Sequence, residues 1–162
     1  MLKWCQRVIF ISFTKIIIFK RRNKSGYNVD YCRLPITDEQ APQEEDFNVL
    51  VRRMIGTSLS QHLIFNCQMG RGRTTTGMIV AVMWRSLLQN SIKISAPIVP
   101  MPTSFDEVDL LRGEYQVMMR LVRVLDEGPG IKAHLDNCID LCGKMQNIRE
   151  AIKVTTLVDL FL

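Results

Sequence analysis

The chain has 162 residues and a formal net charge of +5, with 47% hydrophobic and 23% charged residues. This length suits about one domain with a buried core, and the composition excludes an intrinsically disordered chain. The moderate basic excess favours anionic ligands. Basic and aromatic residues are not interleaved as they are in nucleic-acid binding surfaces, so we expect no nucleic-acid partner.

The five cysteines are an odd number at irregular spacings: Cys5, Cys32, Cys67, Cys138 and Cys142. This pattern gives no disulfide framework and indicates a reducing compartment, so we expect a cytoplasmic protein. Cys138 and Cys142 lie four residues apart, without a second Cys or His pair that would complete a zinc site. We therefore expect buried thiols at these positions, and neither a metal nor another cofactor in the protein.

The first strongly apolar stretch covers residues 7–22 and is rich in β-branched and aromatic residues. Lys15 interrupts it, and its apolar runs fall short of the roughly 20 residues that span a bilayer. We predict one or two buried strands in this stretch. A membrane anchor over residues 8–19, flanked by the basic residues 20–22, is the less favoured alternative.

Two strands and two helices are expected in the next part of the chain. Alternating side chains predict a strand within residues 27–36, followed by a loop at 37–42. Apolar residues at helical spacing predict a helix over residues 43–55. Residues 62–65 form a continuous apolar run, which is typical of a strand buried on both faces. Residues 74–89 are apolar nearly all round and predict a helix in the centre of the fold.

The second half of the chain is expected to be helical. Residues 91–104 contain three prolines and predict an irregular connection. A helix is expected from 104 to about 125, with an apolar stripe formed by Leu111, Tyr115, Met118, Val122 and Leu125. Residues 126–130 break this helix, and a last helix is expected from 131 to about 152. The order of elements indicates an α/β fold in which helices flank a small central sheet.

Residues 66–78, NCQMGRGRTTTGM, join the predicted strand to the predicted central helix. Glycines allow successive backbone N–H groups to point inward, and such a nest at the positive end of a helix binds a phosphate-sized anion. Arg73 can add two parallel N–H bonds to phosphate oxygens. Cys67 is expected to face the same centre, where the local field favours its thiolate. The combination predicts a nucleophilic phosphatase site.

Two further groups are expected to serve this reaction. The leaving alkoxide needs a proton, and Asp38, in the loop after the preceding strand, is the candidate acid. Glu39 is its rival, and Asp38 can alternatively cap the following helix. The hydroxyl of Thr74 can donate to the cysteine sulfur as the phosphoenzyme breaks down. A P-loop nucleotide hydrolase is excluded, because its loop requires a lysine and residues 62–89 contain none.

The spacing Cys67-x5-Arg73-Thr74 resembles the signature of the cysteine-dependent protein tyrosine and dual-specificity phosphatases. The longer stretches CQMGRGRTTTGM, YCRLPITDEQAPQEEDFNVLV and LLRGEYQVMMRLVRVLDEG resemble the paladin group, which is similar to the cysteine phytases. This resemblance implies the cysteine-phosphatase fold. We leave open whether the sheet is complete at its N-terminal side.

The resemblance covers roughly residues 27–152, which we predict to be the phosphatase-like domain. Residues 1–26 form a divergent apolar segment before it, and residues 153–162 a divergent tail. The resemblance also implies that Cys67 is the nucleophile and Asp38 the general acid. The phosphate-binding residues that it implies are Gln68, Met69, Gly70, Arg71, Gly72 and Arg73.

We therefore expect metal-independent hydrolysis of a phosphomonoester through a cysteinyl-phosphate intermediate. The substrate would be an inositol phosphate or a phosphoprotein, and Arg71, if it lies on the rim of the site, favours the inositol phosphate. The alternative is a weak or inactive phosphate-binding scaffold, because Asn66 and Glu39 replace histidines that are usual in relatives. A rhodanese-like sulfur carrier also uses a cysteine loop, but that loop usually lacks the Arg-Thr pair at its end.

Overall fold

The computed structural model describes residues 8–13, 29–38, 40–89 and 115–152. The chain forms two compact units, Met1–Arg85 and Ser86–Leu162. The predicted α/β class with a small sheet is confirmed, and the described part of the second unit is helical, as expected.

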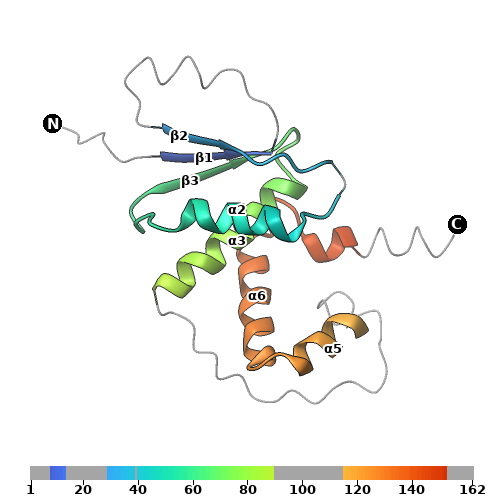
Figure 1. Ribbon diagram of the computed structural model, residues 1–162. Helices are drawn as coiled ribbons and strands as arrows, with labels where there is room; N and C mark the ends of the chain where they lie inside the picture. Colours follow the sequence, from blue (N-terminus) through green and yellow to red (C-terminus); the bar gives the residue numbers. More distant parts are fainter. Residues whose placement is uncertain (1–7, 14–28, 39, 90–114, 153–162) are drawn as a thin grey trace, which may run out of the picture. The chain divides into compact units, whose positions relative to one another are not determined.

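Three parallel strands form the sheet of the first unit, in the order β2-β1-β3 (Figure 1). They are β1 (Val8–Ser12), β2 (Val29–Arg33) and β3 (His62–Asn66). Ser12 lies opposite both Arg33 and Asn66, so the three strands end together. Because parallel strands place their carboxyl ends at one edge, Cys67 leaves the sheet at the edge where the loop after β2 begins. The strands predicted within 27–36 and 62–65 are confirmed.

The middle strand of the sheet comes from the apolar stretch near the start of the chain. Residues 8–12 pair with both other strands, so the sheet cannot form without them. The predicted strand within 7–22 is thus confirmed, and residues 14–22 lie outside the described part of the chain. The domain boundary after residue 26 stays a prediction, although β1 precedes it. None of the helices in the described residues is long and apolar enough to cross a membrane.

Helix α2 (Glu44–Met54) begins where the sequence predicts it. Its first turn is stabilised by a capping box, in which the backbone N–H of Gln43 donates to Asp46 Oδ2 at 2.8 Å. Three acidic residues in that turn complement the positive end of the helix dipole. Gly56, with a φ of 82°, turns the chain away after the helix ends.

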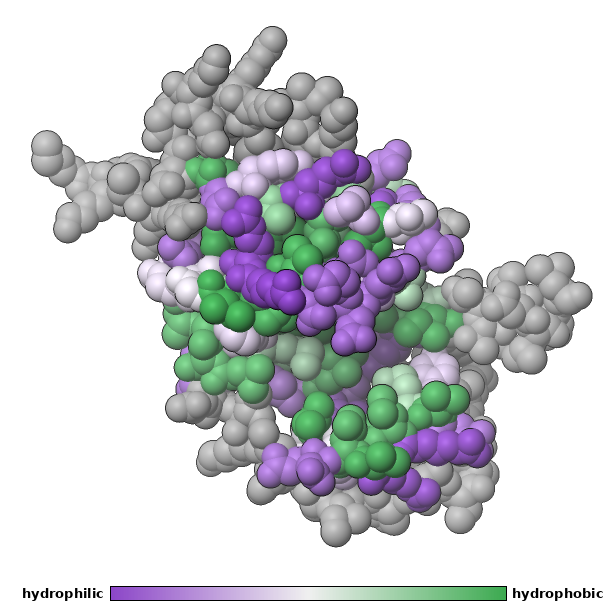
Figure 2. All heavy atoms as spheres, in the orientation of Figure 1, coloured by the Kyte–Doolittle hydropathy of each residue, from purple (hydrophilic) through white to green (hydrophobic). Residues whose placement is uncertain are grey.

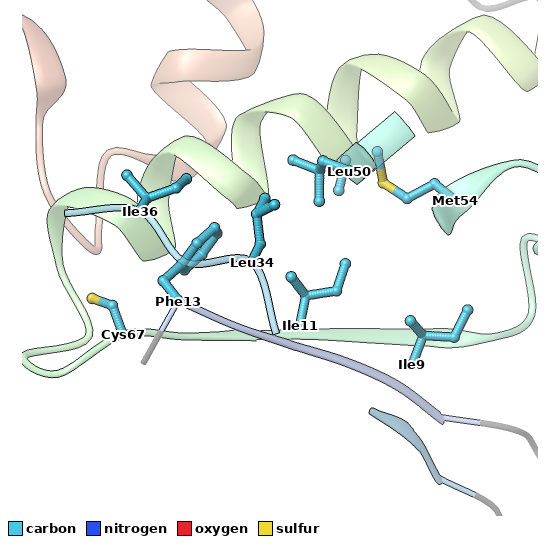
Figure 3. Packing of buried hydrophobic residues seen from close by; sticks show 9 residues of the cluster. Ile9, Ile11, Phe13, Leu34, Ile36, Leu50, Met54 and Cys67 are labelled. Atoms are coloured by element: carbon cyan, nitrogen blue, oxygen red, sulfur yellow. The ribbon is translucent and has the colours of Figure 1, made fainter. Parts of the chain in front are cut away.

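The core of the first unit lies between the sheet and its helices. Figure 1 shows α2 and α3 on one face of the sheet, and Figure 3 shows the side chains between them. Alternate residues of β1 and its continuation point into this core, and α2 contributes residues one turn apart. The members are Ile9, Ile11, Phe13, Leu34, Ile36, Leu50, Met54, Cys67 and Ala81.

The prediction that the third strand is buried on both faces is wrong. His62 and Ile64 are exposed, and Ile64 retains 43% of its accessible surface. β3 lies at the edge of a sheet in which α2 and α3 cover one face, so alternate side chains remain in contact with solvent. A continuous apolar run therefore does not establish burial on both faces.

Helix α3 (Gly72–Leu88) confirms the predicted apolar helix and begins two residues earlier than expected. It packs closely against the sheet at Gly77. A Cβ atom there would lie 2.7 Å from Phe65 Cδ1 and 2.8 Å from Phe13 Cζ, well inside contact distance. The missing side chain therefore sets how near the helix lies to β1 and β3.

The second unit contains α5 (Gln116–Val124) and α6 (Gly128–Cys142), followed by a helical turn at residues 148–152. α6 begins three residues before the expected start at 131, because Pro129 fits the first turn of a helix, where its missing N–H has no partner to lose. Gly128 permits the tight corner with α5, since a Cβ atom there would lie 1.8 Å from the Val122 carbonyl oxygen. Cys138 and Cys142 are buried, as predicted.

The apolar stripe predicted for α5 is partly wrong. Met119 is its buried residue, whereas Met118 and Leu125 are partly exposed. Figure 2 shows apolar side chains gathered on the surface over α5, and the most exposed of them are Val117, Leu121 and Val124. Tyr115 and Val122 of the predicted stripe are half-buried and lie on the same side of the helix as Met119, so the periodicity identified the buried side only in part. The part of this helix predicted before residue 115 lies outside the described residues.

Replacing Gly77 by alanine should lower the stability of the protein. The added methyl group must displace two aromatic rings in a packed core, which costs about 1–3 kcal/mol. Alanine is the better helix former by about 1 kcal/mol, so without the close approach the substitution would be stabilising. Urea unfolding followed by circular dichroism measures the difference, and an unchanged or increased free energy of unfolding would contradict the packing described here.

Candidate active site

Cys67 lies directly after β3, at the beginning of a tight turn into α3. Figure 3 shows it at the margin of the core, with its sulfur directed into the turn. Gly70 adopts a φ of 73°, a left-handed conformation that favours glycine and reverses the chain before the helix begins at Gly72. The thiol is 5% exposed, so it lies at the bottom of the turn and not on its rim.

Backbone amides converge on this sulfur. The N–H groups of Gly70, Arg71 and Thr74 donate hydrogen bonds to Cys67 Sγ. Two of these donors lie in the turn and the third in the first turn of α3, where N–H groups have no partner within the helix. Inward-pointing amides at the positive end of a helix form an anion-binding nest.

The thiolate of Cys67 is stabilised within this nest. Burial acts against the charged form and alone would raise the pKa of the thiol. The hydroxyl of Thr74, which donates to Cys67 Sγ at 3.1 Å, and the backbone amides outweigh burial. The pKa of Cys67 is therefore lowered from its ordinary value. By contrast, burial raises the pKa of Cys138 and Cys142, as expected for structural thiols.

The Arg73 guanidinium joins the turn to the loop that follows β2. Its Nη1 donates to the carbonyl oxygen of Ile36 at 2.9 Å, and its Nη2 forms an ion pair with Asp38 Oδ1 at 2.7 Å. The Arg73 side chain is 10% exposed, whereas that of Asp38 is 60% exposed. Arg73 Nε is buried, and no acceptor for it exists among the described residues.

The structure brings the side chains predicted to take part in the chemistry into contact as two pairs: Thr74 with Cys67, and Asp38 with Arg73. The side chains of Gln68, Met69 and Arg71 are exposed, so the turn faces the sulfur with its backbone. Their predicted roles, like those of Gly70 and Gly72, stay predictions. Glu39, the rival acid, lies outside the described residues.

Asp38 does not cap α2, which was the alternative role predicted for it. The capping residue is Gln43, and its reciprocal partner is Asp46. The loop of Asp38 instead runs to the turn after β3, where Arg73 holds it at two points. This frees Asp38 from a structural role in the helix and places it at the candidate site.

Two contacts at the site were not foreseen from the sequence. The Ile36 carbonyl binds Arg73, and Thr75, which is fully buried, donates its hydroxyl to the Arg71 carbonyl at 3.0 Å. Thr75 thereby fixes the last residue before the helix. The sequence signal for the bond of Thr75 is a threonine four residues after the residue whose backbone carbonyl accepts the bond. A backbone acceptor such as Ile36 has no sequence signal.

Comparison with known proteins places the chain in a family. Residues 7–85 match the family model PTPlike_phytase, which is described as "Inositol hexakisphosphate". Paladin of Xenopus tropicalis is 33% identical over 126 residues, and Paladin of Gallus gallus is 32% identical over the same length. Paladin of Homo sapiens is 31% identical over 126 residues. The chain is a paladin-like member of the phytase-like cysteine phosphatase family.

The similarity to these relatives includes 76% of the chain but only 14% of each relative. The chain therefore spans a small part of the length of the curated relatives that it matches. The family match begins at residue 7 and so includes β1, the central strand. No solved structure matches the chain.

Replacing Thr74 by valine should raise the pKa of Cys67, because the isosteric side chain cannot donate to the thiolate. At neutral pH a smaller fraction of the sulfur would be charged, and alkylation by iodoacetamide should slow. Mass spectrometry of the peptide containing Cys67, over a range of pH, separates this thiol from the other cysteines. Thr76→Val is the matched control, since the Thr76 hydroxyl donates to the Gly72 carbonyl and not to the sulfur. Identical pH profiles for the two variants would contradict the assigned hydrogen bond.

Proposed function

We propose that this chain hydrolyses phosphomonoesters through a cysteinyl-phosphate intermediate. The observation that carries the proposal is the convergence of the Thr74 hydroxyl and three backbone amides on Cys67 Sγ. These donors favour the thiolate, which is the nucleophilic form of cysteine. The family match supports a phosphatase-related activity, and the cysteine mechanism is our inference from the site.

In the first step the phosphoryl group binds in the turn, where amides and the Arg73 guanidinium hold its oxygens. The Cys67 thiolate attacks phosphorus, a sulfur–phosphorus bond forms, and the bond to the ester oxygen breaks. Asp38, in its protonated form, gives its proton to the leaving oxygen. The turn thus supplies charge stabilisation where the transferring group gains negative charge.

In the second step water attacks the cysteinyl phosphate, and the carboxylate of Asp38 accepts a proton from that water. The sulfur–phosphorus bond breaks and the thiolate departs. Thr74 is placed to stabilise it, because its hydroxyl already donates to the sulfur at 3.1 Å. Phosphate leaves, and both catalytic groups return to their starting forms.

The substrate that we favour is an inositol phosphate, with a phosphoprotein as the second choice. The family description names inositol hexakisphosphate, and the Arg71 side chain is exposed beside the turn. A substrate with several phosphate groups gains from an additional cation near the site. The chain spans only a small part of the length of its relatives, so any partner of a longer protein is also a proposal. A cytoplasmic location is a proposal as well.

The second candidate function is a phosphate-binding scaffold without turnover. One observation favours it: the carboxylate of Asp38 is ion-paired with Arg73, so in this arrangement the candidate acid is held by the arginine that would bind phosphate. The nest of amides binds an anion whether or not an acid is present. Asn66, in place of the usual histidine, departs from the catalytic pattern at the residue next to Cys67.

Assays with 4-nitrophenyl phosphate and inositol hexakisphosphate test the two functions. Cys67→Ser should abolish turnover, and Asp38→Asn should lower kcat for inositol hexakisphosphate by about 10²–10⁴-fold, the usual contribution of a positioned acid. Glu44→Gln, which removes an exposed carboxylate from the first turn of α2, is the control and should leave kcat unchanged. Phosphate binding without phosphate release from the unmodified chain would reject catalysis and leave the scaffold.

A further inference from the structure

We propose that Asp38 acts as an internal substitute for the substrate phosphate on Arg73, and that a bound phosphoryl group displaces it. Binding of the substrate would then release the carboxyl group that the reaction needs. This inference rests on the proposed phosphate site. It adds a coupling between the phosphate-binding arginine and the candidate acid.

The geometry of the guanidinium carries this argument. Nε and Nη2 of an arginine share one edge of the planar group, and a phosphate accepts two parallel hydrogen bonds from such an edge. In Arg73 this edge is half used: Nη2 contacts Asp38 Oδ1 at 2.7 Å, while Nε is buried without an acceptor among the described residues. A phosphoryl group that takes both donors must remove Asp38 from Nη2. Two anions cannot share that edge.

The other side of the guanidinium keeps the loop in place during this exchange. Nη1 donates to the Ile36 carbonyl at 2.9 Å, two residues before Asp38. That contact does not compete with a phosphate on the opposite edge. The loop therefore stays attached to Arg73 while the Asp38 carboxylate moves away, and its 60% exposed side chain has free space into which to turn.

Displacement also makes the candidate acid available. In the structure the carboxylate of Asp38 contacts the guanidinium of Arg73. A phosphoryl group on Nε and Nη2 ends that contact, so the carboxyl group is no longer held by Arg73. Substrate binding and release of the candidate acid are thus one exchange on the same guanidinium.

Binding of inorganic phosphate, measured by isothermal titration calorimetry at pH 7, tests the inference without requiring turnover. Asp38→Asn removes the competing charge while keeping the size of the side chain. An ion pair with one exposed partner contributes about 0.2–1 kcal/mol, so phosphate should bind about 1.4- to fivefold more tightly to this variant. Glu44→Gln removes the same charge from the exposed start of α2 and should change affinity less.

A double-variant cycle separates displacement from a general loss of negative charge. Glutamine lacks the guanidinium and its charge, so in an Arg73→Gln background the effect of Asp38→Asn should disappear. An equal effect in both backgrounds would overturn the proposed competition. Asp38→Ala replaces Asp38→Asn if the latter fails to fold, as judged by circular dichroism.

The remaining outcomes distinguish this inference from the function on which it rests. Phosphate binding by the unmodified chain with unchanged affinity in Asp38→Asn would overturn the displacement and leave the phosphate site intact. Absence of phosphate binding in every variant would overturn the phosphate site itself, and the inference with it. Tighter binding in Asp38→Asn that depends on Arg73 supports both.

Discussion

The candidate site depends on the short turn from β3 into α3. The parallel register ends β3 at Asn66, and α3 begins at Gly72, so few residues reverse the chain. With Gly70 in a left-handed conformation, the amides of that turn point inward and meet the sulfur of Cys67. The close approach of α3 to the sheet at Gly77 holds the helix end against the strand end. The fold therefore surrounds the sulfur with backbone donors before any side chain contributes.

Opposing effects set the character of Cys67. Its burial among apolar residues disfavours a charge, and hydrogen bonds from Thr74 and the turn favour one. The hydrogen bonds prevail because several donors converge on one atom from fixed backbone positions, so no reorganisation is needed when charge develops. Cys138 and Cys142 are also buried, but burial raises the pKa of each. Burial alone therefore does not distinguish a reactive cysteine from a structural one.

The sequence revealed most of the site because its determinants are local. Cysteine, glycine, arginine and threonine follow one another within one turn, and their spacing alone predicted the contact between Thr74 and Cys67. Packing between distant segments was harder to predict. The exposed face of β3 depends on its place at the sheet edge, and the buried face of α5 on which side meets α6. The ion pair of Arg73 joins loops at two strand ends, and only the register of the sheet brings them together.

Arg73 takes part in both proposed steps, the binding of phosphate and the release of the candidate acid. Its contacts to Ile36 and Asp38 hold the loop of the candidate acid, and its Nε is buried without an acceptor among the described residues. In our proposal the same side chain therefore positions the acid and binds the phosphate. In the function that we propose, a phosphoryl group takes Nε and Nη2, and the carboxylate of Asp38 leaves Arg73 as that group binds. In the alternative scaffold, the ion pair between Asp38 and Arg73 persists. The two proposals for this fold therefore differ in whether that one ion pair opens.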